Sequence, residues 1–466
     1  MPNGTYGVVR GVGVNLSSYS IQSLSTHSKQ VASYKIFFQI TSYFKIQSAI
    51  IHENSFVFQT NNKMSMQISP NTVTHARTLA NIYKYFPLII LSVCGFTFNT
   101  SEFIPIGLLS DIAHDFSISE PQAGMLITVY AWVVMIASLP LMMIASKFAL
   151  KKLLLAVVGL FVLSHVLSTV STTFATLMTS RIGVACAHAI FWSIASPLAV
   201  KIAPDGKKSL GLSMMVAATS VAMVVGLPLG RIVGLYVGWR TTFLCIAVIS
   251  AILFILLTIV FPKIPASGSL KITELPKLMT DPVLGGIFLM TAIAIIGHYS
   301  AYSYIEPYLG QVAKLSPDAV TLALTVFGGI GIIGSFIFSK LFSKYHYFFN
   351  LFAVFGIALF IFLLKFASGN LVTLYIVLIG WGLAITAYNL VYQYEIIKFA
   401  PNTTAIAMSI YSGIYNLGIG GGAIVGGLVI DNLSIAYTGF VGCVFLIVAG
   451  IYLYIKLLPR LRAVAD

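Results

Sequence analysis

Four residues in two apolar runs are the first candidates for chemistry. Glu102 lies in NTSEFIPIGLL, and Arg181, His188 and Trp192 lie in SRIGVACAHAIFWS. The spacings of seven and four residues would place the last three on one face of a helix. Ionisable groups in apolar runs are costly unless they face a cavity or a partner, and proton coupling requires a buried carboxylate. We therefore predict a proton-coupling site of Glu102, Arg181 and His188; the alternative for Glu102 is a packing role alone.

Tyrosines mixed with amides form a second set, in HYSAYSYIEP and AYNLVYQYEIIK. Helical spacing puts three groups on shared faces: Tyr299, Tyr302 and Glu306; Tyr388 and Tyr392; Asn389 and Gln393. Aromatic stripes often serve packing or mark the membrane interface, but amides in mid-helix favour a polar cavity. Aromatic faces suit the C–H faces of a sugar, and amides suit its hydroxyls. We predict a sugar site lined by Asn99, His188, Trp192, Tyr299, Tyr302, Tyr388, Asn389 and Gln393.

Two further carboxylates, Glu306 and Glu395, lie near the ends of their apolar runs. They can contact loops or extend toward the membrane surface, and these roles account for their positions as well as proton coupling does.

The elements that position these residues are predicted to be membrane-spanning helices. Apolar residues make up 58% of the chain and charged residues 9%, with a mean hydropathy of +0.94; soluble proteins carry roughly 25% charged residues. Runs of about 20 residues or more can cross a hydrocarbon core of ~30 Å. They lie near 87–109, 122–145, 152–170, 174–200, 208–236, 240–261, 283–309, 317–343, 348–367, 371–398, 402–430 and 435–458. We predict an all-α membrane protein of twelve transmembrane helices in two six-helix bundles.

Two glycine ladders indicate that the bundles are related by duplication. Gly226, Gly230 and Gly234, with Pro228 among them, recur 192 residues later as Gly418, Gly422 and Gly426. Glycine at every fourth position leaves a helix stripe without side chains, so another helix can approach closely. Matching ladders in two halves are typical of transporters with internal repeats. The candidate residues then fall on helices 1, 4, 7 and 10, the same element of each three-helix repeat.

The chain divides into four segments on this interpretation. Residues 1–65 contain no long apolar run and no signal-peptide core. We interpret them as a disordered or non-native leader, with the start at Met64 or Met66; a regulatory tail is the alternative. An N-terminal bundle is expected at 66–262, a proline-containing cytoplasmic linker at 263–282 and a C-terminal bundle at 283–466.

The distribution of basic residues predicts orientation. The net charge is +14, but the basic residues stand singly or in pairs between apolar runs, so we expect no nucleic-acid partner. The connections are numbered by the span that precedes them, so the connection between spans 1 and 2 is odd-numbered. The odd-numbered connections hold three basic residues: Arg240, Lys314 and Lys365. The even-numbered connections hold twelve: Lys147, Lys151, Lys152, Lys201, Lys207, Lys208, Lys263, Lys271, Lys277, Lys340, Lys344 and Lys398. Both termini are therefore predicted in the cytoplasm.

The four cysteines are isolated in apolar stretches, and we expect no metal site.

Several motifs resemble the major facilitator superfamily. GLPLGRIVG with GWR resembles the helix-5 motif of its drug:proton antiporter branch, and SEFIPIGLLSDIA resembles the Glu-containing helix-1 signature of that branch's bacterial sugar and drug exporters. YAWVVMIASLPLM, SRIGVACAHAIFWSIASPLAVKIAP, AYSYIEP and YSGIYNLGIGGGAIVGG are similar to bacterial sugar efflux transporters. The resemblance covers about 66–460. It implies a multi-pass protein of the bacterial inner membrane, with the proton as coupling ion and no other cofactor, and it assigns proton coupling to Glu102 and Arg181.

One departure concerns the connection between helices 2 and 3. The superfamily usually has Gly-x-x-x-Asp-Arg-x-Gly-Arg-Arg there, whereas this chain has MIASKFALKK. Lys151 and Lys152 match the basic end, but the Asp and both glycines are missing. Another contact must then hold the outward-open state.

Four functions are compared. The first is a proton-driven exporter of sugars or sugar analogues, acting as a monomer within the bilayer, with drugs as the alternative substrate. The second is a sugar importer of the same fold. A membrane enzyme would need a nucleophile or metal constellation, and the chain has no GxSxG, HExxH or clustered Asp pair. A receptor without transport would not explain the paired ladders.

Overall fold

The computed structural model describes residues 70–145, 148–204, 207–265, 275–401 and 403–463. The chain divides into two units, Met1–Val73 and Thr74–Asp466. The expected leader at 1–65 lies outside the described residues, as do residues 266–274 of the expected linker, whose later part contains a short helix. The second unit contains both predicted bundles, called here the N-terminal half (up to residue 265) and the C-terminal half (from residue 275).

The described residues form helices and connections, with no strand among them. The N-terminal half contains α2 (Pro70–Gly107), α3 (Leu109–Phe116), α4 (Glu120–Ala145), α5 (Leu150–Thr169), α6 (Phe174–Ile202), α7 (Lys208–Val221), the π-helix η1 (Ala222–Gly226), α8 (Leu227–Val237) and α9 (Trp239–Val260). The C-terminal half contains α10 (Leu275–Thr280), α11 (Leu284–Tyr302), α12 (Ile305–Gln311), α13 (Pro317–Leu341), α14 (His346–Leu351), the π-helix η3 (Phe352–Gly356), α15 (Ile357–Ala367), α16 (Leu371–Phe399), α17 (Thr404–Asn432), the short 3₁₀ helix η4 (Ile435–Tyr437), α18 (Thr438–Tyr452), the π-helix η5 (Leu453–Leu457) and α19 (Leu458–Ala463).

Twelve helical segments among the described residues are long and apolar enough to cross a membrane, which confirms the predicted number of spans. Three long helices begin after side chains that accept backbone hydrogen bonds: Thr173 before α6, Ser316 before α13 and Asn370 before α16. These caps satisfy N–H groups that a helix start leaves without partners. All three lie in odd-numbered connections, so one end of the spans is fixed by local capping.

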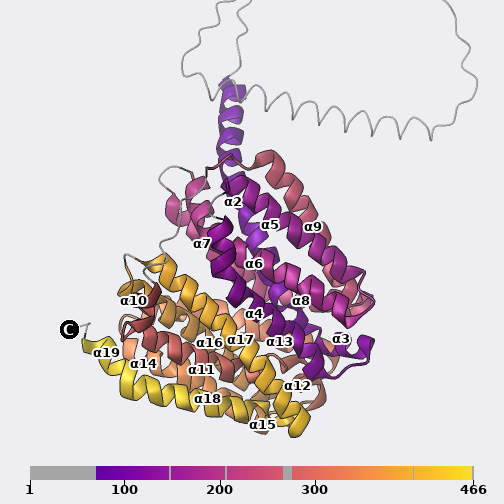
Figure 1. Cartoon of the computed structure of the whole chain (residues 1–466), viewed down its shortest axis with the longest axis vertical. Helices are drawn as coiled ribbons and strands as arrows, with labels where there is room; N and C mark the ends of the chain where they lie inside the picture. Colours follow the sequence, from indigo (N-terminus) through magenta and orange to yellow (C-terminus); the bar gives the residue numbers. More distant parts are fainter. Residues whose placement is uncertain (1–69, 146–147, 205–206, 266–274, 402, 464–466) are drawn as a thin grey trace, which may run out of the picture. The chain divides into compact units, whose positions relative to one another are not determined.

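Two pairs of helices make most of the contact between the two halves, and shorter elements add to it. In Figure 1, α4 of the N-terminal half packs along α17 of the C-terminal half, and α8 packs near α13. One apolar core lies within the N-terminal half. The other fills the C-terminal half and also includes residues from the end of α2, α3 and α4. The halves are therefore joined by a shared apolar core as well as by polar contacts.

The seventh span is interrupted, which corrects the prediction that Tyr299, Tyr302 and Glu306 share one helical face. Helix α11 ends at Tyr302 and α12 begins at Ile305. Pro307 explains the break, since a proline has no N–H for the carbonyl four residues earlier and its ring clashes with that carbonyl. Glu306 consequently points away from the face that carries the two tyrosines, toward the N-terminal half.

The first glycine ladder packs against the first span. A methyl group at Gly226 would overlap Thr100, and one at Gly230 would overlap Ile104. Gly234 faces Leu108 in the same way, one turn further along. Pro228 is buried just after the π-helix η1, where the altered hydrogen bonding accommodates a residue without an N–H. The ladder thus joins α2, the first span, to η1 and α8 of the fifth span inside the N-terminal half.

The second ladder makes the equivalent contact in the C-terminal half. Gly418 faces Ile295, Gly422 faces the carbonyl of Ile296, and Gly426 faces the carbonyl of Ser300. Helix α17 therefore approaches α11 as the segment of η1 and α8 approaches α2. The ladders hold each half together, whereas other glycines, among them Gly420, lie where the two halves meet.

A matched pair of substitutions in α17 tests this ladder. At Gly422 a methyl carbon would lie 2.7 Å from the backbone oxygen of Ile296, whereas at Gly413 it would meet nothing within 4 Å. Gly422→Ala is expected to destabilise the protein by about 1–3 kcal/mol through overpacking. Gly413→Ala should be neutral or stabilising by up to about 1 kcal/mol, because alanine favours a helix. Thermal unfolding of the detergent-purified variants measures both; equal midpoints would contradict the packing role.

Candidate functional site

A polar cluster in the N-terminal half contains all three predicted coupling residues. The Oε2 atom of Glu102 on α2 lies 3.7 Å from Nε2 of His188 on α6. Tyr130 on α4 lies between two of these groups: its ring is 5.6 Å from the His188 ring and 4.5 Å from the Arg181 guanidinium carbon. The Trp192 ring lies 6.1 Å from His188. Helices α2 and α6 therefore bring Glu102, Arg181, His188 and Trp192 together, and α4 adds Tyr130.

Arg181 is held by the residue beside Glu102 rather than by Glu102 itself. Its Nη1 donates to the carbonyl oxygen of Ser101 at 3.1 Å and to the Ser101 hydroxyl at 3.4 Å. That hydroxyl is also hydrogen-bonded to Nε2 of His165 on α5, at 2.8 Å. Arg181 is 1% exposed and forms no ion pair within 4.0 Å among the described residues. The Arg181 guanidinium therefore interacts with the Glu102 carboxylate electrostatically, without a direct contact, and the charged or ionisable side chain nearest to the carboxylate is that of His188.

The cluster contains buried polar atoms without hydrogen-bond partners among the described residues. They include Nδ1 of His188, the hydroxyl of Tyr130 and Nε of Arg181. An unsatisfied buried donor or acceptor costs about 1–3 kcal/mol. Polar groups maintained at that cost are suited to bind a polar substrate.

A second cluster lies on the C-terminal half. His298 accepts a hydrogen bond from the Trp381 indole at 3.0 Å and stacks on the Tyr302 ring at 5.3 Å. Tyr299 is 6.3 Å from the ring of Tyr415 on α17. The Tyr415 hydroxyl interacts with both Tyr299 and Asn389.

The two clusters face each other across the boundary between the halves. The carboxylate of Glu102 lies within electrostatic range of Tyr299 and of Tyr415. A largely buried carboxylate of one half thus lies near aromatic and amide side chains of the other half.

The other predicted lining residues lie in different surroundings. Asn99 is buried and its amide donates to the Thr219 carbonyl on α7 at 3.4 Å. Tyr388 is fully buried and its hydroxyl donates to Thr291 at 3.0 Å, which is the arrangement of a packing residue. Gln393 is exposed, one turn beyond Asn389. The structure therefore places Tyr299, Tyr302 and Asn389 at the second cluster and leaves Tyr388 inside the C-terminal half.

A buried ion pair joins the halves at the end that carries the odd-numbered connections. Nη1 of Arg231 on α8 lies 3.1 Å from Oε1 of Glu306 on α12, and both residues are about 5% exposed or less. The other Glu306 oxygen accepts from the backbone N–H of Ser110 at 3.1 Å. Arg231 also donates to the Gly107 carbonyl. We call Arg231, Glu306, Ser110 and Gly107 the odd-end latch.

Asp111, on α3 beside the latch, is a partly buried carboxylate. Burial raises the pKa of Asp111, and the charges of Arg231 and His114 oppose that increase. The net increase means that Asp111 takes up a proton at a higher pH than an exposed aspartate.

Further contacts between the halves continue from this end to the middle of the spans. Near the end, Gln311 donates to Glu120 at 2.7 Å, and the Tyr236 hydroxyl donates to Asp318 at 3.0 Å. Deeper, Thr128 donates to the Gly420 carbonyl at 3.2 Å. Together with the latch, these contacts close the odd-numbered end of the boundary.

The unusual connection between spans 2 and 3 is attached to the end of the sixth span. The Lys151 ammonium donates to the carbonyls of Thr258, at 2.9 Å, and Phe261, at 2.5 Å. The backbone N–H of Leu150 donates to the Ile264 carbonyl at 3.1 Å. A cation at a helix C-terminus satisfies free carbonyls and favours the helix dipole. Lys151 thus fastens this connection within the N-terminal half.

Sequence reasoning missed Tyr130, Ser101, His165 and Arg231. The first two are common residue types in apolar runs. His165 is a lone histidine in an apolar run, a signal that could have been followed. Arg231 is a charged residue inside the first glycine ladder, and that position was the available signal.

Residues 91–403 match the family model described as Major Facilitator Superfamily. The chain is 40% identical over 386 residues, 83% of this chain and 97% of the relative, to a probable sugar efflux transporter of Mannheimia succiniciproducens. The fold is similar to a D-xylose–proton symporter (TM-score 0.67, 14% identity, 80% and 98% of the two chains). It is also similar to a bacterial homolog of the human lysosomal transporter Spinster in an inward-facing, unoccupied conformation (TM-score 0.65, 14% identity, 80% and 97%).

Proposed function

Because this chain belongs to the Major Facilitator Superfamily, we propose that it exports sugars or sugar analogues from the cytoplasm in exchange for protons. The observation that carries the proposal is the position of the Glu102–His188 pair, which lies opposite Tyr299 and Tyr415 at the boundary between the halves. The relative that is 40% identical is named a probable sugar efflux transporter, which supports the choice of substrate. We propose no cofactor other than the proton, no catalytic activity and a functional monomer.

Proton coupling requires that the proton affinity of Glu102 differ between two conformations, because a ligand shifts an equilibrium only through its differential affinity. In the described conformation Glu102 has His188 as a direct neighbour and the Arg181 charge nearby. Arg181 is fixed by Ser101 on the same helix as Glu102, and by α5 through His165. Movement of α2 relative to α6 would change the distance between carboxylate and guanidinium, and with it the proton affinity.

Sugar binding is assigned to the second cluster. The rings of Tyr299, Tyr302 and Tyr415 offer faces for C–H groups, and the Asn389 amide offers a donor and an acceptor for hydroxyls. An aromatic ring of a drug could stack on the same tyrosine rings, so a multidrug–proton antiporter is the alternative function. A sugar importer is the other alternative, since alternating access does not fix the direction of transport.

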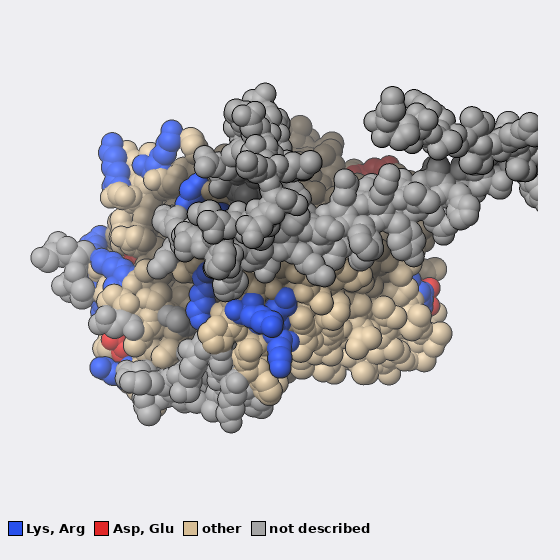
Figure 2. Space-filling view, turned by 90° about the horizontal axis from the view of Figure 1, so that it is seen from above, with Lys and Arg blue, Asp and Glu red and all other residues tan. Residues whose placement is uncertain are grey.

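The proposed orientation places the even-numbered connections and both termini in the cytoplasm of a bacterial inner membrane. In the view of Figure 2, most of the visible Lys and Arg side chains lie toward one end of the molecule. Cytoplasmic connections attract such residues. The odd-end latch is then on the outer side, and the described conformation is closed to the outside.

Efflux from inverted membrane vesicles tests the proposal. Vesicles containing the protein are loaded or supplied with a panel of radiolabelled sugars and antibiotics, with and without a pH gradient. Accumulation of a sugar that depends on the gradient supports the function. Accumulation of antibiotics alone would favour the multidrug alternative, and no gradient dependence for any substrate would contradict proton coupling.

Asn389→Leu is a test of the sugar site. Loss of the amide leaves a substrate hydroxyl without its partner, at about 1–3 kcal/mol, so apparent affinity should fall by about fivefold to a hundredfold. Transport assayed over a range of sugar concentrations gives this change. Tyr388→Phe is the matched control on the same helix, because the Tyr388 hydroxyl donates to Thr291 inside the C-terminal half. The apparent affinity of this variant for the sugar should be unchanged. An Asn389→Leu variant with normal affinity would remove Asn389 from the site.

A further inference from the structure

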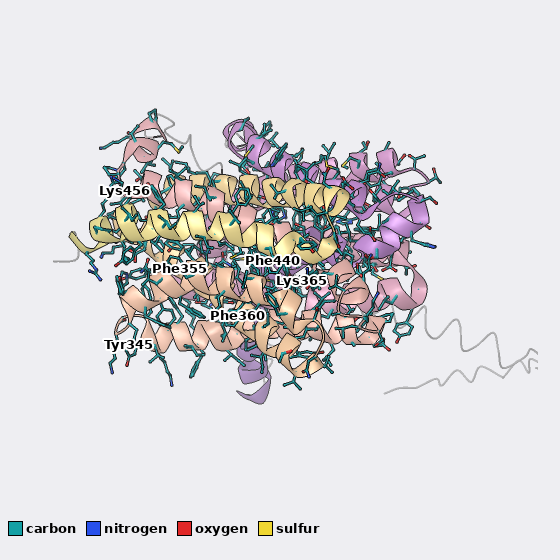
Figure 3. All side chains as sticks on the ribbon, turned by 90° about the horizontal axis from the view of Figure 1, so that it is seen from below. Tyr345, Phe355, Phe360, Lys365, Phe440 and Lys456 are labelled. Carbon is teal, nitrogen blue, oxygen red and sulfur yellow. The ribbon has the colours of Figure 1, made fainter. Side chains whose placement is uncertain are left out.

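A cavity lies at the end of the C-terminal half that carries the even-numbered connections, remote from both clusters. It has a volume of about 410 Å³ and is lined by Lys344, Tyr345, His346, Tyr347, Phe348, Leu458, Leu461 and Arg462. The lining comes from the connection between spans 8 and 9, the start of α14, and α19 at the end of span 12. Figure 3 places Tyr345 and Lys456 at this same end, with Phe355 and Phe360 farther along the helices. Transport as proposed above does not use the cavity.

The lining carries positive charge that no described carboxylate neutralises. Lys344 and Arg462 are exposed, and among the described residues neither forms an ion pair. The Arg462 guanidinium lies 4.2 Å from the Tyr347 ring centroid, and the Lys344 ammonium lies 5.1 Å from that of Tyr345. Both cations therefore rest on aromatic rings, which position them without cancelling their charge.

Glu395 does not neutralise this charge. Its carboxylate contacts the His346 ring, and its side chain is fully buried and does not line the cavity. The two recorded partners of the cavity cations are thus aromatic, and a ligand with negative charge is the chemistry that fits.

The cavity also adjoins an apolar surface. Phe348 is 58% exposed, and Phe355, Ile451 and Ile455 on the neighbouring helices are exposed as well. These residues belong to the spans His346–Ala367 and Ile435–Arg462, so their exposed faces meet hydrocarbon in a membrane. Tyrosines at a span end mark the level of the lipid headgroups. Cations and tyrosines thus lie at headgroup level, next to a surface suited to acyl chains.

We propose that this cavity binds the headgroup of an anionic phospholipid, with the phosphate between Lys344 and Arg462 and the acyl chains along Phe348 and Ile455. A free soluble phosphate would use the same cations, but it would gain nothing from the adjoining apolar surface. The location at a span end therefore favours the lipid. The proposal depends on the chain spanning a membrane and not on which substrate it transports.

Lipid titration of the purified full-length protein tests the proposal. Dioleoyl-phosphatidylglycerol is added to the protein in detergent, and bound lipids are counted by native mass spectrometry. The double variant Lys344→Gln/Arg462→Gln is expected to bind the tightest lipid about thirtyfold more weakly, since each cation near a membrane surface contributes about a factor of five. The control variant Lys398→Gln/Lys456→Gln removes the same charge from exposed positions of the same half outside the cavity, and it should bind as the unaltered protein does.

Three outcomes would overturn the proposal. The first is an equal loss in the control variant, which would mean that general charge attracts the lipid. The second is equal binding of dioleoyl-phosphatidylcholine, which has no net charge. The third is full displacement of the lipid by inorganic phosphate at millimolar concentration, which would assign the site to a soluble anion. Sugar efflux in the same variants is measured in parallel, so that failure of this site and failure of the proposed transport function are separate results.

Discussion

Glu102→Gln is expected to abolish gradient-driven sugar accumulation while substrate exchange continues. Glutamine has the shape of the protonated acid and cannot release a proton, so the conformational change no longer depends on the pH gradient. One coupled proton supports about a tenfold sugar gradient per pH unit. In the variant this ratio should fall to about one. Counterflow of labelled against unlabelled sugar, which needs no proton, should stay near its normal rate.

Glu395→Gln is the matched control for this experiment. Glu395 is also a buried carboxylate paired with a histidine, His346, but it lies in the C-terminal half away from both clusters. The sugar accumulation ratio of the Glu395→Gln variant should remain near that of the unaltered protein. If Glu102→Gln retained a full gradient with an unchanged pH profile, Glu102 would have no part in coupling. A loss in Glu395→Gln alone would move the coupling site to the C-terminal half.

The residues of the cluster in the N-terminal half could be singled out because their signals are local in sequence. Glu102, Arg181 and His188 stand out as ionisable groups in apolar runs, and helical spacing alone places Arg181, His188 and Trp192 on one face. The twelve spans were predictable for the same reason, since hydropathy and length identify a span without knowledge of its neighbours. The ladders at Gly226 and Gly418 likewise predicted close helix packing within the chain.

The contacts between helices could not be predicted from local patterns. Ser101 and His165 are 64 residues apart, and Arg231 and Glu306 belong to different halves. Nothing in the spacing of either pair indicates its partner. The break at Pro307 turned Glu306 away from Tyr302, because proline removes a hydrogen bond that a continuous helix needs. The prediction of one shared face, made without regard to the proline after Glu306, was therefore wrong, and the partner of Glu306 was not predicted.

Arg231→Met is expected to open the odd-numbered end of the boundary between the halves. Removing one partner of a buried ion pair leaves the other charge unpaired, at a cost of about 3–5 kcal/mol. Here Glu306 is buried only while the halves are closed at this end, so the cost applies to the closed state. The equilibrium should shift toward the open state by more than about a hundredfold. Distances between spin labels at His114 and Lys314, in a background without the four native cysteines, should lengthen.

Arg240→Met is the matched control for the latch. Arg240 pairs with Asp115 at 2.7 Å near the same end, but these side chains are 35% and 39% exposed and both belong to the N-terminal half. Exposed pairs contribute about 0–1 kcal/mol, so this variant should shift the distances little. Adding Glu306→Leu to Arg231→Met should restore much of the closed population, because an apolar pair replaces the unpaired charge. Identical distance distributions for Arg231→Met and Arg240→Met would show that the buried pair does not hold this end closed.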